Sequence, residues 1–196
     1  MNSAVAATSR YIPIVQQPYC CVAACFLMVM LRHKIPLIAQ ESLAYELGLI
    51  VPKEKRMLFA KVRTGKRPKS GYGTQIQKPE YAPDKIFSKL KIPLRMRFLS
   101  GSSLQGKVSE TLSEIVNQNG DALVCFDAGK LYGTSYKGGH VCVVDAIDVK
   151  RGLVRLVDPS ASNPKWRDVA IAKLERAMNI HGDENMCGIW QLYKKR

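Results

Sequence analysis

One cysteine in this sequence stands where a nucleophile could be generated. Cys21 opens an apolar run that predicts a helix, so its side chain should lie beside the unpaired backbone N–H groups of the helix start. Such surroundings favour the thiolate, which is the form of cysteine that attacks a carbonyl carbon. Two alternatives stay open, because Cys20 is adjacent and Cys21 could equally be a small core residue.

A histidine and an aspartate further along the chain could activate that thiol. His140 follows two glycines, which let the backbone approach a substrate closely, and it opens a predicted strand. If residues 148–152 form a hairpin turn, residues whose numbers sum to about 300 pair across it, and Asp158 faces Cys142. Asp158 is then diagonal to His140 on one face of the sheet, whereas Asp145 points to the other face. We therefore predict that Asp158 orients His140 as general base, although a register shift of one residue would separate them.

Two glutamines precede the candidate nucleophile. A side-chain N–H of Gln16 or Gln17 could stabilise the oxyanion that forms when the thiolate attacks, together with the backbone N–H of Cys21. A solvated pair of surface residues is the alternative interpretation. The residues alone do not choose between the two glutamines.

Three segments together resemble a known enzyme family. Residues 16–28, QQPYCCVAACFLM, look like the nucleophile segment of double-glycine leader peptidases and related papain-like proteins, in which Gln precedes Cys-Gly-Pro/Ala-Ala and an apolar helix. Residues 139–145, GHVCVVD, and 154–159, VRLVDP, are similar to the Gly-His strand and the Asp-Pro end of that family. Order and approximate separations agree across residues 14–160.

The resemblance implies a role for each of four residues. Cys21 would be the nucleophile, His140 the general base, Asp158 the orienting carboxylate and Gln16 the oxyanion donor. Two departures leave a shifted alternative with Cys20 and Gln17: valine replaces the usual glycine after Cys21, and Gln16 precedes Cys21 by five residues where closer relatives often have six.

The elements that must position these residues follow from hydrophobic periodicity. The run at 21–32 is apolar almost all round, so its helix should pass through the core. Helices come first and strands later, which predicts an α+β, papain-like fold with N-terminal helices packed on a C-terminal antiparallel sheet, in a single domain over 1–196. The other predicted helices are 38–47, 84–90, 109–119 and 168–179, and the predicted strands are 122–127, 140–148, 153–157 and 188–193.

The positive charge is concentrated in one stretch. The chain has a formal net charge of +14, and residues 53–97 carry fourteen Lys or Arg against three acidic residues, which is +11. Within it we expect an exposed basic loop insertion at about 53–83, rich in turn-forming residues. Such a charge favours an anionic partner, either an acidic peptide substrate or nucleic acid bound through Lys66, Arg67 and Lys69.

The six cysteines indicate a reducing compartment, and we expect a cytoplasmic protein. Four of them fall in predicted buried helix or strand, unlike the loop cysteines of a disulfide framework. Their spacing is not a usual one for zinc ligands, so we expect neither a metal nor a cofactor. At about 12 residues, the apolar run from Cys20 is too short to span a membrane.

Three functions fit these patterns. The first is a thiol hydrolase, a cysteine peptidase that cleaves a peptide or amide bond through Cys21, His140 and Asp158. An acyltransferase would use the same residues with an amine in place of water. The third is a catalytically weak or inactive papain-like module that holds an anionic partner through its basic loop.

Overall fold

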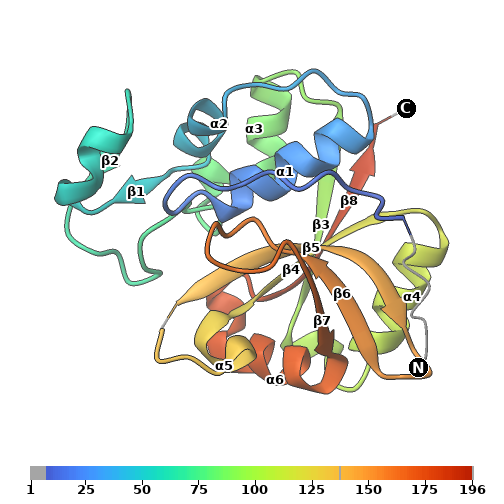
Figure 1. Ribbon diagram of the computed structural model, residues 1–196. Helices are drawn as coiled ribbons and strands as arrows, with labels where there is room; N and C mark the ends of the chain where they lie inside the picture. Colours follow the sequence, from blue (N-terminus) through green and yellow to red (C-terminus); the bar gives the residue numbers. More distant parts are fainter. Residues whose placement is uncertain (1–7, 137, 196) are drawn as a thin grey trace.

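A six-stranded antiparallel sheet forms the centre of the computed structural model, which describes residues 8–136 and 138–195 (Figure 1). The strand order is β3-β8-β4-β5-β6-β7, so β4 and β5 are central while β3 and β7 are the edges. The strands are β3 (Leu94–Ser100), β4 (Asp121–Asp127), β5 (Gly139–Asp148), β6 (Leu153–Val157), β7 (Trp166–Ala170) and β8 (Gly188–Lys194).

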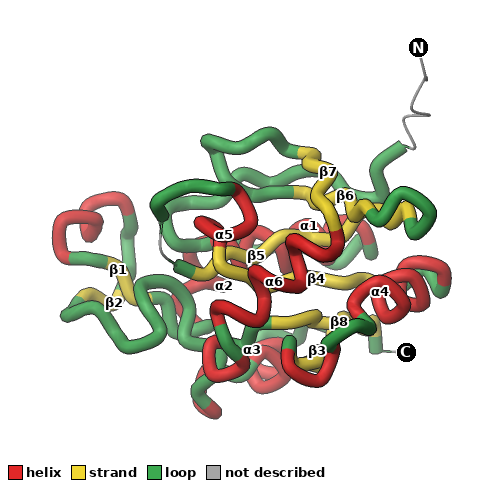
Figure 2. The backbone as a smooth tube through the Cα atoms, turned by 90° about the horizontal axis from the view of Figure 1, so that it is seen from below, coloured by secondary structure: helices red, strands yellow, loops and turns green. Residues whose placement is uncertain are grey.

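Helices cover both faces of this sheet. On one face lie α1 (Cys21–Arg32), α2 (Gln40–Glu46) and α3 (Pro83–Lys89), and on the other lie α4 (Val108–Asn117), α5 (Ala128–Tyr132) and α6 (Ile171–His181). Figure 2 shows the second group from below. The predicted α+β fold with N-terminal helices on an antiparallel sheet is confirmed, and α4, α5 and α6 complete the second layer.

The central strands alternate between two cores. In β4, Leu123 and Cys125 pack on the α1 side, while Ala122, Val124 and Phe126 pack on the α6 side. Because both faces are covered, the strand is apolar almost without interruption instead of alternating with polar residues. The same two-residue period sends successive side chains of β5 to opposite cores.

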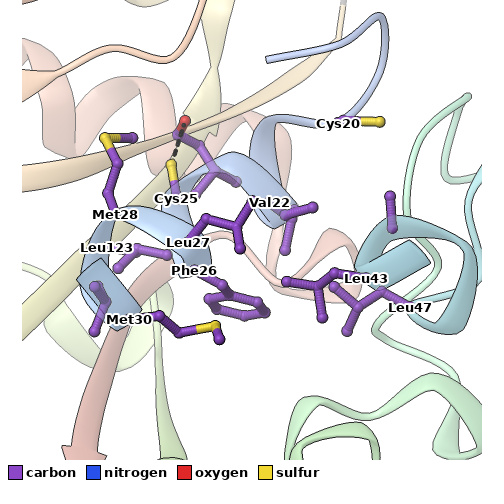
Figure 3. Packing of buried hydrophobic residues seen from close by; sticks show 14 of the residues in the cluster. Cys20, Val22, Cys25, Phe26, Leu27, Met28, Met30, Leu43, Leu47 and Leu123 are labelled. Carbon is purple, nitrogen blue, oxygen red and sulfur yellow. Dashed lines mark hydrogen bonds between the residues drawn. The ribbon is translucent and has the colours of Figure 1, made fainter. Parts of the chain in front are cut away.

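Helix α1 passes through the core, as its composition predicts. Nine of its twelve residues are buried. Figure 3 shows Val22 and Phe26 directed towards Leu43 and Leu47 of the α2 segment. The helix ends where Lys34 takes a left-handed conformation and the next N–H donates to the Met30 carbonyl over 2.9 Å. None of the described helices combines the length and apolarity needed to cross a membrane.

Two edge strands differ from the sequence-based prediction. The predicted helix at 168–179 is wrong at its start, because residues up to Ala170 belong to β7 and the helix begins at Ile171. β7 contacts only one strand and is largely exposed, so its residues lack the apolar pattern of a central strand. β3 was not predicted, although Leu94, Met96 and Phe98 alternate with arginines, which is the period of a half-buried strand.

The basic insertion runs outside the main sheet. It contains the short strand β2 (Arg63–Thr64), which pairs in parallel with β1 (Ile50–Val51) just before the insertion, and 3₁₀ turns at Lys53–Leu58 and Pro79–Tyr81. In Figure 1 these strands project from one side of the molecule. The loop after β2 is anchored by Gln75, a buried side chain that donates to the carbonyl of Gly71 over 3.2 Å and accepts from Ser70 Oγ over 2.7 Å.

Candidate active site

A cavity of about 310 Å³ opens where α1 begins and β5 begins. Its lining includes Gln16, Cys21, Cys125, Gly139 and His140. Segments 120 residues apart in the chain therefore contribute to one cleft, and they include the predicted nucleophile, base and oxyanion donor.

The two adjacent cysteines have different surroundings. Cys21 is the first residue of α1, is only partly buried and lines the cavity. Cys20 is fully buried, its thiol donates to the Pro18 carbonyl over 3.5 Å, and burial raises its pKa to about 12. Tyr19, just before the pair, has a left-handed backbone conformation with a φ of 65°. Cys21 alone of this pair faces the space that a substrate could enter.

His140 is hydrogen-bonded to Asp158, the carboxylate that the hairpin argument selected. His140 Nε2 lies 2.8 Å from Asp158 Oδ1, so Nδ1 is the ring nitrogen left for a second partner. Both side chains are buried. A histidine held in this way has one tautomer and one orientation fixed by the carboxylate.

Four donors surround the Asp158 carboxylate. Besides His140, the backbone N–H of Ser160 donates to Oδ1 over 2.8 Å, and the Tyr132 hydroxyl and Asn163 amide donate to Oδ2 over 2.6 and 3.0 Å. Burial alone would raise the pKa of Asp158, but these hydrogen bonds, that of His140 first, lower this pKa to about 2. Asp158 is therefore an anion at neutral pH despite being buried.

The pKa of His140 is shifted in the complementary direction. Burial alone would lower this pKa, but the neighbouring Cys142 and the hydrogen bond with Asp158 raise it well above its ordinary value, with Cys21 contributing a smaller hydrogen bond. Burial also raises the pKa of Cys142, which is thus a neutral thiol near pH 7. We therefore attribute the charged form of His140 chiefly to the Asp158 carboxylate.

The register that places Asp158 depends on a bulge. Val143 pairs with Val157 at the site end of the β5–β6 hairpin, as the sequence predicts, but near the turn Asp148 pairs with Leu153, one residue out of that register. The irregularity falls at Asp145, whose carboxylate accepts from the Ser9 hydroxyl and the Arg10 backbone N–H over 2.9 and 2.8 Å. The bulge therefore lies between the hairpin turn and His140, so the pairing near His140 keeps the predicted register.

Gln16 is connected to the same part of the cleft. Its backbone N–H donates to the carbonyl of Pro159, next to Asp158, over 2.8 Å, and its side chain lines the cavity with Cys21. Gln17 does not line the cavity, and its backbone N–H donates to the side chain of Gln40. Of the two glutamines, Gln16 lines the cavity with Cys21 and Gln17 does not.

Sequence reasoning missed two residues of this site and one constraint on a third. Tyr132 and Asn163 both donate to Asp158, but α5 is only five residues long and the loop after Pro159 has no periodicity that would single them out. Gly139 is also constrained by a contact that sequence reasoning did not include: a Cβ atom there would lie 2.3 Å from His181 Nε2. The glycine makes room for an imidazole ring and also lines the cavity, so the predicted close approach of a substrate to this backbone stays a prediction.

Comparisons with known proteins identify the fold. No family model matches the chain, and no curated protein matches it. Among solved structures, a Bacillus anthracis protein assigned as a C39-like peptidase is similar, with 18% identity, a TM-score of 0.56 and coverage of 94% of this chain and 95% of that one. The peptidase domain of Streptococcus ComA, a bifunctional ABC transporter involved in a quorum-sensing pathway, has 13% identity, a TM-score of 0.54 and coverage of 96% and 100%. Both are peptidases of the type that the sequence motifs resemble, and the papain-like fold prediction is confirmed.

Proposed function

We propose that this protein is a cysteine peptidase in which Cys21 is the nucleophile and His140 the general base. The observation that carries the proposal is the meeting of Cys21 and His140 on one cavity, with His140 fixed by a buried, ionised Asp158. The fold shared with two peptidase structures supports the same reaction class. Gln16 is proposed as the oxyanion donor because it lines the cavity beside Cys21.

The reaction divides into two acyl transfers. The reaction starts with the proton of the Cys21 thiol held by His140 in its charged form. The sulfur attacks the substrate carbonyl carbon, and negative charge develops on the carbonyl oxygen near Gln16 and the start of α1. His140 then returns the proton to the leaving amine as the C–N bond breaks. Water attacks the thioester, His140 accepts a proton from it and is charged again, and the acid is released as the bond to the Cys21 sulfur breaks.

The surface around the cleft favours an acidic peptide. Arg67 and Lys69 line a second hollow of about 380 Å³ that shares Tyr72, Gly139 and His181 with the main cavity. Basic side chains at the rim raise the local concentration of anionic ligands. We therefore propose that the insertion guides an acidic segment of a peptide or protein towards Cys21, instead of holding nucleic acid.

The proposal is tested by labelling with a thiol-directed peptide electrophile. We expect Cys21→Ala to abolish labelling, whereas Cys20→Ala, the matched control one residue away, retains it because that thiol is buried. Asp158→Asn should slow the labelling of Cys21 by misorienting His140. Labelling that persists in Cys21→Ala and disappears in Cys20→Ala would overturn the assignment.

Hydrolysis and acyl transfer are distinguished by the acceptor. A peptide that is cleaved to a free acid in the presence of millimolar primary amine identifies a hydrolase. Exclusive formation of the amide with that amine would instead assign an acyltransferase to the same residues. Neither product, with salt-sensitive binding of an anionic polymer, would favour the inactive binding module.

A further inference from the structure

A second cluster of reactive side chains lies in the wall of the same cleft. Cys125 of β4, His181 at the end of α6 and Cys187 just before β8 bring one ligand atom each to within 4.8 Å of the other two. The two sulfur atoms are 3.4 Å apart. Cys125 and His181 line the cavity, whereas Cys187 lies behind them with no exposed surface. The proposed peptidase reaction uses none of the three.

The backbone holds these side chains in place from three directions. Cys125 pairs with Gly188 in the β4–β8 ladder, so the residue before Gly188 is adjacent to it. The Cys187 carbonyl accepts from the Gly101 N–H over 2.9 Å, which fixes the start of β8. The carbonyl of His181 accepts from the Asn185 amide over 2.7 Å and closes the turn between helix and strand.

The His181 ring is positioned by packing and not by a polar partner. It rests against Gly139, where any Cβ atom would collide with Nε2. Among the described residues no hydrogen bond uses either of its ring nitrogens. Burial lowers the pKa of His181, so its imidazole is neutral at pH 7 and has a free lone pair.

Two thiols and a neutral imidazole make a donor set that suits a thiophilic divalent cation. In a tetrahedral zinc site with Zn–S bonds of about 2.3 Å, the sulfur atoms lie about 3.8 Å apart, close to the separation of Cys125 and Cys187. Burial and the adjacent Cys125 raise the pKa of Cys187, so without a cation the Cys187 thiol stays protonated. A dication would neutralise both thiolates, and binding would release two protons.

We infer that Cys125, His181 and Cys187 form a binding site for Zn²⁺, with its fourth position open to the cleft. Three protein ligands and an open position leave room for a water molecule or for a group of a bound peptide. The site is separate from Cys21 and His140. The inference of a metal site does not depend on the proposed peptidase chemistry, because the two sites share no residue.

The experiment uses reduced, metal-free Cys21→Ala protein, which removes the exposed thiol. Titration with Co²⁺ should give one equivalent of bound metal, with the thiolate charge-transfer and intense visible bands of a tetrahedral site, and Zn²⁺ should then displace it. Calorimetry with Zn²⁺ in buffers of different ionisation enthalpy should report release of about two protons.

Variants locate the metal. Cys187→Ser and His181→Gln should each weaken Zn²⁺ binding by at least 10-fold to 100-fold. Cys25→Ala, which removes another fully buried thiol that donates to the Val141 carbonyl and does not belong to this cluster, should leave the affinity unchanged. His181 is partly exposed, so His181→Gln should fold, and the loss of the Zn²⁺-induced rise in Tm checks its binding independently of the spectra.

Three results would overturn the inference. The first is no Co²⁺ or Zn²⁺ binding by the reduced protein. The second is binding that survives Cys187→Ser and His181→Gln but is lost in Cys142→Ala, which would move the metal to the cluster of His140, Cys142 and Asp158. The third is isolation of the pair as a Cys125–Cys187 disulfide, two hydrogens lighter, that binds no metal after reduction.

Discussion

Asp158 is a buried anion, and both of its carboxylate oxygens are hydrogen-bonded. It has no exposed surface, and each of its oxygens accepts two hydrogen bonds. Removing a carboxylate from water is costly unless such partners replace the lost hydration. The cost is offset here by His140 in its charged form, so Asp158 and His140 behave as one unit whose protonation is linked to stability.

We predict that this unit makes stability depend on pH in two windows. Because the pKa of Asp158 is lowered to about 2, its contribution is present above the unfolded-state value and is lost as the pH falls through about 2. Because the pKa of His140 is raised, its contribution is present below the unfolded-state value and is lost as the pH rises through the folded-state value.

Asp158→Asn should therefore cost about 2 kcal/mol of unfolding free energy near pH 5, measured by urea denaturation. A cost that does not shrink towards pH 2 contradicts the assignment.

Tyr132 is predicted to be a positioning residue. Tyr132→Phe keeps the ring but removes a donor from Asp158, so the carboxylate is less well fixed and kcat/KM should fall roughly 10-fold. The pKa of Asp158 should rise, so the loss of stability in acid should begin at higher pH. Tyr11→Phe is the matched control, because Tyr11 donates to the buried Asp121 over 2.7 Å, remote from the cavity lining. Its stability should fall similarly, with kcat/KM unchanged; equal effects on activity would refute the role of Tyr132.

At the scale of elements, the β5–β6 hairpin decides whether Asp158 meets His140. A strand side chain changes face with every residue, so a slip by one position would turn Asp158 away from His140. The bulge at Asp145 corrects the register between the turn and the site. Its carboxylate is held by the Ser9 and Arg10 segment, which therefore contributes to the site from outside it.

We predict that Asp145→Ala destabilises the bulge that sets the register of β5 against β6. It leaves two donors without an acceptor and should destabilise the protein by about 1–3 kcal/mol. The fraction of molecules that react with the thiol electrophile should fall as the hairpin samples a second register. Asp148→Ala, at the exposed end of the same strand, removes one bond to the Arg151 N–H and is the control. An Asp145→Ala protein with full labelling would show that the bulge does not depend on this carboxylate.

At the scale of the whole molecule, charge is distributed unevenly around the cleft. Lys66, Arg67 and Lys69 are exposed on the insertion, next to the hollow that adjoins the cavity. Lys150 and Arg151 lie at the far end of β5 from His140, and Lys173 lies near them on α6. The molecule thus offers two sets of three exposed basic residues, one beside the cleft and one remote.

Neutralising the first set is predicted to slow the capture of acidic peptides. The Lys66→Gln, Arg67→Gln and Lys69→Gln triple variant should have kcat/KM for an acidic peptide lowered about 10-fold at low salt, and the difference should vanish near 1 M salt. The control is Lys150→Gln, Arg151→Gln and Lys173→Gln, which removes the same charge from the remote end. Equal losses in the two variants would mean that net charge, and not the insertion, attracts the substrate.

Local pattern was sufficient for much of the fold. The apolar run without Gly or Pro determines α1 from Cys21 to Arg32, and β-branched runs determine most of the central strands, because burial on both faces leaves a strong signal. β7 and the short helix α5 have no such signal, since neither buries a complete face of its own. The order of the nucleophile, histidine and aspartate motifs was likewise readable from the chain.

The sequence by itself determined which residue types could perform thiol chemistry, and only the tertiary structure decided which atoms meet. Cys20 and Cys21 are the same residue type in adjacent positions, but the fold buries Cys20 and leaves Cys21 on the cavity. Gln16 is distinguished from Gln17 by a backbone bond to Pro159, 143 residues away. Likewise Tyr132 reaches Asp158, and His181 reaches the cavity, through contacts between different segments of the chain. Local propensity carries no information about such contacts, because they depend on how the elements pack and on the register of β5 against β6.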